Sequence, residues 1–172
     1  MTKLLGAGLT VVACGLMGIT VSRNYTLRPM QLRALQSALQ MLETEMVFTA
    51  TPLPEALERI GRHSSLPLSL LFCGASQHLK GNEGYTAAEA WEKALDSFAE
   101  YTALTTEDQE ILRRFGQGLG NSSTEEQVKN LALAREQLKQ QEAKAENVRQ
   151  RQEKLWRNLG FVVGLVLVLI FY

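Results

Sequence analysis

The hydrophobic positions of this 172-residue chain form an uncharged apolar run at each end and a helical repeat between them. The first run extends from Leu4 to Val21, and the second from Leu159 to Tyr172. Between the runs, apolar residues recur every three or four positions without strand-like alternation, which predicts an all-α domain. The pattern divides the chain into an N-terminal transmembrane anchor (4–21), a helical bundle (22–157) and a C-terminal transmembrane anchor (158–172).

Prolines, glycines and capping residues divide the central segment into six expected helices. Pro29 suits the first turn of a helix, because the N–H that proline lacks has no helical partner there. Thr51 is expected to cap the second helix with its hydroxyl group, and Thr86 and Ser123 each begin the Ser/Thr-x-x-Glu pattern of a capping box. The expected helices cover residues 29–48, 52–62, 65–79, 86–98, 106–115 and 124–157.

The last of these helices has a stripe of positions spaced alternately by four and three residues. Six of its nine positions are apolar and three are glutamine, one of them in the middle, so we expect it to pack within the bundle rather than form a strong coiled-coil dimer. A continuous helix over 124–157 is about 50 Å long. The stripe consists of Gln127, Leu131, Ala134, Leu138, Gln141, Ala145, Val148, Gln152 and Leu155.

The lengths and flanking charges of the terminal runs predict the topology. As helices they measure about 27 Å and 21 Å, against a hydrocarbon core of roughly 30 Å, so the second is short for a span. Basic residues next to a span are retained in the cytoplasm. Three arginines follow the first run and four basic residues precede the second, which predicts a cytoplasmic bundle. These residues are Arg23, Arg28, Arg33, Arg149, Arg151, Lys154 and Arg157.

An alternative interpretation takes the N-terminus as a lipoprotein signal. The stretch Val11-Val12-Ala13-Cys14-Gly15 resembles a bacterial lipoprotein processing site, and this interpretation would export the bundle. Lys3 is the only basic residue before the apolar run, and the run continues beyond Cys14 to Val21. Both features are unlike a signal peptide. We therefore favour the anchor.

The remaining composition argues against several functions. The central part has a net charge near −1, since Lys3 is the one charged residue outside it and the whole chain is neutral. This predicts no nucleic-acid binding. Cys73, His63 and His78 lack the spacing of a metal site, so neither metal nor cofactor is expected. No nucleophile–base arrangement is present, and the protein is expected not to be an enzyme.

A glycine-rich segment, Gly116-Gln-Gly118-Leu-Gly120, could be compared with a phosphate-binding loop. No strand precedes it and no GxxxxGK[ST] pattern occurs in the chain. The glycines are instead typical of a turn between a helix that ends and a helix that begins.

Several segments together resemble one known family. The stretch from Leu32 to Glu45, the segment Thr51-Pro52-Leu53-Pro54-Glu55-Ala56-Leu57, the glycine turn and the glutamine-rich last helix look like the signature of the stage III sporulation protein AB family. That family is similar to the cytoplasmic domains of inner-membrane platform proteins in type II secretion and type IV pilus systems, which are six-helix bundles.

The resemblance implies a component of the channel, or feeding-tube, apparatus between mother cell and forespore in endospore formation. It implies a location in the mother-cell membrane around the forespore, with the bundle in the mother-cell cytoplasm. The implied partners are the ATPase stage III sporulation protein AA and other proteins of the apparatus. Secretion platform proteins carry two bundles and three membrane helices, so one bundle with two anchors leads to the hypothesis of a homo-oligomer.

Our prediction is a non-enzymatic membrane platform that couples to a cytoplasmic ATPase. The alternative is a membrane-anchored adaptor or scaffold unrelated to a secretion-type machine. No catalytic residue is assigned. The expected partner-contact residues are charged positions beside the TPLPEAL segment, namely Glu43, Glu45, Glu55, Glu58 and Arg59.

Overall fold

Helices are the only regular secondary structure in the described part of the molecule. The computed structural model describes the backbone of residues 26–120 and 123–171, with side chains for 26–120, 123 and 125–152. Within these residues there are six helices and no strand, which confirms the predicted all-α fold and the number of helices. They are residues 26–47, α2 (Leu53–His63), α3 (Leu68–Lys80), α4 (Ala87–Ala99), α5 (Thr106–Gln117) and α6 (Thr124–Phe171).

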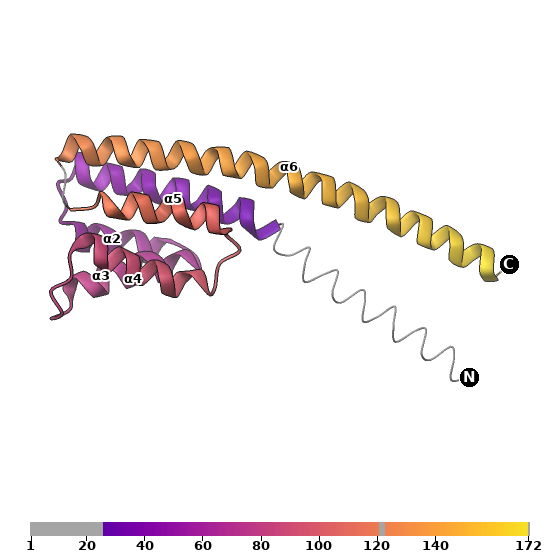
Figure 1. Ribbon diagram of the computed structural model, residues 1–172, viewed down its shortest axis with the longest axis horizontal. Coiled ribbons are helices and arrows are strands. Elements are labelled where there is room, and N and C mark those ends of the chain that lie inside the picture. Colours follow the sequence, from indigo (N-terminus) through magenta and orange to yellow (C-terminus); the bar gives the residue numbers. More distant parts are fainter. Residues whose placement is uncertain (1–25, 121–122, 172) are drawn as a thin grey trace.

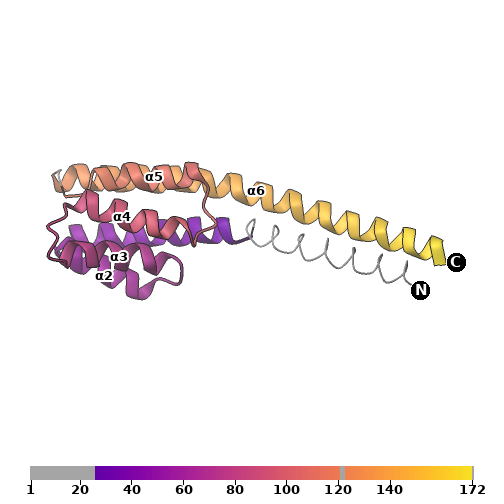
Figure 2. The ribbon, with the colours of Figure 1, turned by 60° about the horizontal axis from the view of Figure 1, so that its bottom comes forward.

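The helices are arranged in two layers. Helices α2, α3 and α4 form one layer, and the helix of residues 26–47 lies with α5 and α6 in the other (Figure 1). From α2 to α6, each helix packs against the next one along the chain. Figure 2 shows that α6 continues well beyond the ends of the other labelled helices. Its polar N-terminal part therefore belongs to the bundle, and its C-terminal part projects from it.

Trp91 lies at the centre of the contact between α4 and α5. Its side chain is 1% exposed, and its ring meets Phe72 and Phe115 edge-on at centroid distances of 5.7 and 5.2 Å. The indole N–H donates a hydrogen bond to the carbonyl oxygen of Leu112 at 2.9 Å, so the polar atom of the ring is satisfied although it is buried. Gly116, one turn further along α5, brings its backbone directly against the ring.

Capping boxes begin two of the helices as the sequence predicts. The Thr86 hydroxyl accepts from the N–H of Glu89, while the Glu89 carboxylate accepts from the N–H of Thr86. Ser123 and Glu126 form the same reciprocal pair. Both pairs satisfy backbone N–H groups that have no partner within the helix.

The prediction that Thr51 caps α2 is wrong. The N-cap of α2 is Pro52, and no side chain caps this helix. The Thr51 hydroxyl instead donates to Glu45 Oε2 at 2.8 Å. A hydrogen bond to a carboxylate is stronger than one between neutral groups, so the hydroxyl is used to hold the end of the preceding helix.

The stripe of α6 packs into the bundle as expected. Leu131, Ala134, Leu138 and Ala145 are at most 4% exposed, while Val148 is 39% exposed near the end of the side chains described. Polar pairs fasten this helix to residues 26–47. Arg33 and Gln36 both donate to Glu142, and Arg135 donates to Glu43 and Gln40.

A buried ion pair connects three helices. Asp108, near the start of α5, is fully buried and accepts two hydrogen bonds from the guanidinium group of Arg28, at 2.7 and 2.9 Å. It also accepts from the N–H of Thr105 at 2.9 Å, and Arg28 donates to Gln141 of α6. Hydrogen bonding to Asp108 raises the pKa of Arg28 despite partial burial. The beginning of the 26–47 helix is thus fixed to both α5 and α6.

The two predicted membrane anchors lie outside the residues whose side chains the structure describes. The predicted N-terminal anchor, 4–21, lies outside the described residues. The predicted C-terminal anchor, 158–172, falls where the backbone of α6 is described to Phe171 but its side chains are not. Within the residues whose side chains the structure describes, no helix has an apolar stretch long enough to cross a bilayer.

Candidate functional site

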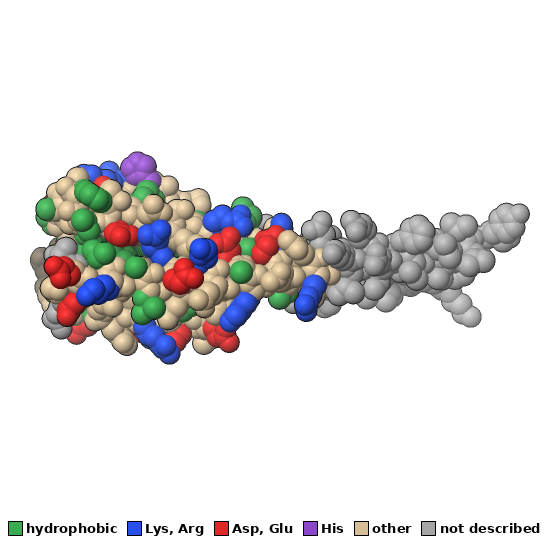
Figure 3. Space-filling view, turned by 90° about the horizontal axis from the view of Figure 1, so that it is seen from above, with side chains coloured by type: hydrophobic (Ala, Val, Ile, Leu, Met, Phe, Trp, Pro, Cys, Tyr) green, Lys and Arg blue, Asp and Glu red, His purple; other side chains and the backbone are tan. Residues whose placement is uncertain are grey.

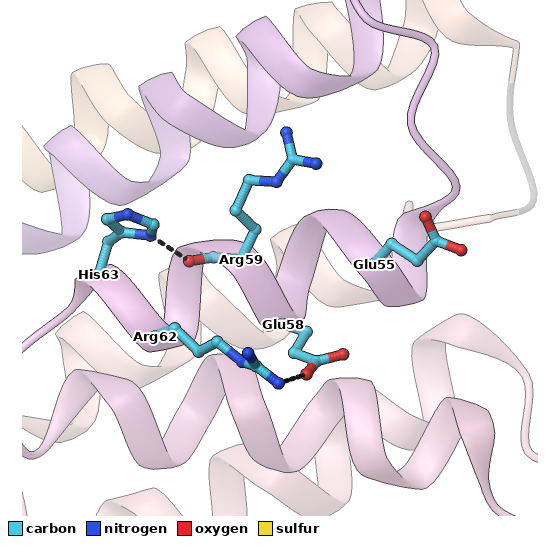
Figure 4. A pocket seen from close by; sticks show the side chains of 5 residues that line it. All are labelled: Glu55, Glu58, Arg59, Arg62 and His63. Atoms are coloured by element: carbon cyan, nitrogen blue, oxygen red, sulfur yellow. Dashed lines mark hydrogen bonds and ion pairs between the residues drawn. The ribbon is translucent and has the colours of Figure 1, made fainter.

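The outer face of α2 is an open surface lined by charged side chains. This helix buries Ala56, Leu57, Ile60 and Gly61 on its inner side. The opposite side borders a shallow hollow of about 350 Å³ in which all the lining side chains come from α2 (Figure 4). The lining residues are Glu55, Glu58, Arg59, Arg62 and His63.

Glu58 lies at the centre of this surface and connects two helices. Its carboxylate forms ion pairs with Arg62, one turn further along α2, and with Lys80 at the end of α3. The hydrogen bond from Lys80, followed by that from Arg62, holds the pKa of Glu58 below its ordinary value. A second hollow of about 450 Å³ begins on the other side of Glu58 and Arg62 and includes Cys73. The charged surface therefore extends across α2 and α3.

Glu45 extends the surface toward the end of the 26–47 helix. Arg59 donates two hydrogen bonds to its carboxylate, at 2.9 and 3.1 Å, and Thr51 and Thr49 donate at 2.8 and 3.2 Å. The hydrogen bond from Thr51 is the largest cause that lowers the pKa of Glu45, followed by that from Arg59. The carboxylate thus joins the loop after the 26–47 helix to α2.

Four of the five predicted contact residues lie on this surface. Glu55 and Arg59 are exposed, and Glu45 and Glu58 are partly exposed. Within the described residues, the Glu55 carboxylate makes neither an ion pair nor a hydrogen bond, and it points away from the other labelled side chains (Figure 4). Glu43 does not belong to the group, because it turns toward α6 and pairs with Arg135.

Sequence reasoning missed Arg62, His63 and Lys80 as members of this surface. Arg62 follows Glu58 by four residues, and this spacing predicts that the two side chains are neighbours on one helix face. Lys80 comes from another helix, 22 residues from Glu58, and no local spacing predicts that contact. His63 Nδ1 lies 2.8 Å from the carbonyl oxygen of Arg59, so this nitrogen is the donor.

The chemistry of the surface suits recognition of a charged protein. Its carboxylates are matched by arginine and lysine, and solvent-exposed ion pairs contribute only about 0–1 kcal/mol each, so a partner can exchange them at small cost. No group of His, Cys, Asp and Glu within the described residues could hold a metal ion. Lys and Arg side chains are also interspersed with Asp and Glu over the face seen in Figure 3, which shows no extended basic patch for nucleic acid.

The lowered pKa of Glu45 leads to a prediction about acid stability. A carboxyl group whose pKa is lower in the folded state stabilises the fold above its unfolded value, near 4.5, and this contribution is lost as the pH falls through the folded-state pKa. We expect Glu45→Gln to destabilise the bundle near neutral pH and to weaken the decline in stability below pH 4.5. Urea unfolding from pH 3 to 7 would measure both effects. An unchanged pH profile would contradict the role assigned to the Arg59 and Thr51 contacts.

Comparisons with known proteins place this helical bundle among sporulation proteins. The family model described as stage III sporulation protein AB matches residues 3–172. Stage III sporulation protein AB of Bacillus subtilis (strain 168) is 39% identical over 171 residues, covering 99% of each chain. A solved structure of stage III sporulation protein AB superposes with a TM-score of 0.69 at 34% identity, covering 73% of this chain and 98% of that one.

The chain therefore belongs to the stage III sporulation protein AB family, as its sequence segments predict. Membership supports a role in sporulation, and nothing in the names of these relatives indicates a catalytic activity.

Proposed function

We propose that this protein is a non-enzymatic membrane platform of the channel apparatus between mother cell and forespore. In this proposal the bundle lies in the mother-cell cytoplasm, and both termini are anchored in the membrane that surrounds the forespore. The bundle couples to a cytoplasmic ATPase, stage III sporulation protein AA, and α6 connects that contact to the membrane.

The observation that carries the proposal is the position of the charged surface on α2. It lies in the layer formed by α2, α3 and α4, whereas α6 lies in the other layer (Figure 1). A soluble partner can therefore approach Glu55, Glu58 and Arg59 without obstruction by α6. Opposite charges across an interface chiefly increase association rate and specificity, which suits a contact that forms during assembly.

The ion pairs also connect the charged surface on α2 to the neighbouring helices. Glu45, Glu58 and their partners join α2 to the end of the 26–47 helix and to α3. The 26–47 helix is in turn paired with α6 through Glu43 and Arg135. A partner that binds α2 would thus contact a helix that is connected to α6 through the 26–47 helix.

In-cell crosslinking would test the proposal. A photoreactive residue at Glu55 in the full-length protein is expected to capture the cytoplasmic ATPase in sporulating cells. Leu133 of α6 is the matched control position, because its side chain is 58% exposed and lies on a different helix. We expect no ATPase to be captured from position 133.

The captured protein distinguishes the alternatives. Capture of extracytoplasmic proteins alone would overturn the cytoplasmic orientation and the platform with it. Capture of a cytoplasmic protein unrelated to the channel would favour the adaptor. Equal capture of the ATPase from positions 55 and 133 would contradict the assignment to α2.

A further inference from the structure

One face of the 26–47 helix and the residue that follows it is exposed and uncharged. Its positions are separated alternately by four and three residues, so they form a single line along the helix. Met30, Met41 and Phe48 are 57%, 41% and 82% exposed. Ser37 and Thr44 between them are exposed as well, and Ala34 is half-buried against the core. We name this face the uncharged stripe: Met30, Ala34, Ser37, Met41, Thr44 and Phe48.

The stripe is uncharged because every charged residue of this helix is used elsewhere in the bundle. The helix contains two arginines and two glutamates, and each forms an ion pair with another helix. These pairs direct the four charged groups toward α2, α5 and α6, and Arg33, which is 62% exposed, borders the stripe beside Met30 and Ser37. The pairs are Arg28 with Asp108, Arg33 with Glu142, Glu43 with Arg135 and Glu45 with Arg59.

The polar groups of the stripe already have hydrogen-bond partners. The Ser37 hydroxyl donates to the carbonyl oxygen of Arg33 at 3.2 Å, and the Thr44 hydroxyl donates to that of Gln40 at 3.0 Å. Burying a hydroxyl without a partner is costly, and these two avoid most of that cost. Contact with another apolar surface would therefore leave no donor of the stripe unsatisfied.

We propose that the uncharged stripe is the contact through which two copies of this chain associate. A repeat of 3.5 residues is the spacing at which two helices pack along a common seam. An uncharged face needs an uncharged partner face, and a second copy presents the same one. In a two-fold contact each residue of one copy meets the same patch of the other, so complementarity is required of one surface alone.

The orientation of the two copies follows if the proposed membrane anchoring is accepted, and this step rests on the proposed function. Both copies then have their α6 helices directed toward one bilayer, so the two-fold axis is perpendicular to it. The 26–47 helices pack in parallel, with Met30 opposite Met30 and Phe48 opposite Phe48. The 26–47 helix, which carries the stripe, runs alongside the N-terminal part of α6 (Figure 1), so a bilayer entered by the C-terminal end of α6 would not lie along the length of this helix.

Cysteine crosslinking of the full-length protein in membranes of sporulating cells would test this contact. In a background with Cys14→Ser and Cys73→Ser, we expect Phe48→Cys and Met30→Cys each to give a covalent homodimer on oxidation. Leu133→Cys is the matched control, since its exposure of 58% is close to the 57% of Met30 and it lies outside the stripe. It should give at least about tenfold less dimer.

A disruptive variant provides the second measurement. Met41→Glu places two like charges opposite each other within the seam, and we expect it to reduce dimer formation at Phe48→Cys by at least about tenfold. Leu133→Glu, the control, should leave the yield unchanged. Met41 is 41% exposed, so the substitution should preserve the helical circular dichroism of the folded protein.

Three results would overturn the inference: no dimer from either stripe position, equal dimer from position 133, or crosslinking to a different protein. Dimers that form only between a Met30→Cys copy and a Phe48→Cys copy would show an antiparallel contact, and would overturn the orientation. The Glu55 capture experiment does not depend on this contact. A dimer without captured ATPase would contradict the proposed function alone.

Discussion

Replacing Gly116 with alanine is expected to reduce the free energy of unfolding by about 2–3 kcal/mol, although alanine is the better helix former. A Cβ atom at this position would lie 2.1 Å from Trp91 Cδ1 and 2.8 Å from Cγ. The indole cannot move aside, because Phe72 and Phe115 enclose it and its N–H is bonded to Leu112. The helices α4 and α5 would have to separate. Chemical denaturation of the variant would measure the loss.

Gly74→Ala is the matched control for this prediction. Gly74 also lies inside a helix, but a Cβ atom there would meet Ala94 Cβ at 3.4 Å, which is ordinary contact. The helix propensity of alanine should then dominate, and stability should be unchanged or increase by up to about 1 kcal/mol. An equal loss of unfolding free energy in both variants would indicate backbone effects common to the two glycines. The Trp91 contact would then be rejected as the cause.

Asp108→Asn is the second substitution for which a large effect is expected, with a loss of about 3 kcal/mol. Asparagine keeps the shape of the side chain but removes the charge, and it leaves the guanidinium group of Arg28 without an ionic partner. Breaking a buried pair in this way costs about 3–5 kcal/mol, and we expect the lower value because the side chain of Arg28 remains 19% exposed.

Asp96→Asn tests whether burial is the reason for that effect. Asp96 also accepts a hydrogen bond from an arginine, Arg113, but its side chain is 65% exposed. Its loss should change stability by less than about 0.5 kcal/mol. Equal thermal shifts in the two variants would show that burial of Asp108 is not decisive.

The positions of the helices could be predicted because their signals are local. Proline at a helix start, a capping box or a glycine turn acts over three or four residues, and the observed boundaries lie close to the expected ones except at the end of α6, which continues to Phe171 instead of ending at residue 157. Gly118 is the C-cap of α5, and Gly120, with φ of 78°, forms the turn that the glycines indicate. Gly116 does not belong to that turn, because it lies within α5 against Trp91.

The tertiary contacts could not be predicted in the same way. Asp108 has the sequence signature of an exposed residue in the first turn of a helix, yet Arg28, 80 residues away, makes its burial possible. Four residues of the candidate surface could be predicted because they lie beside the TPLPEAL segment in the sequence, namely Glu45, Glu55, Glu58 and Arg59. That segment begins α2, which has one exposed face. Glu43 lies apart from that surface because its helix faces α6 at that position.

The continuous α6 helix, Thr124–Phe171, determines how the bundle is oriented around its own axis. Each residue of an α-helix adds about 1.5 Å and turns the chain by about 100°. One residue inserted in the projecting part would therefore rotate α2 and its charged surface by more than a quarter turn relative to the C-terminal end. Seven inserted residues would restore the direction to within about 20° and add about 10 Å of length. The length of the projecting helix thus determines the direction in which the charged surface faces, as well as its distance from the C-terminal end.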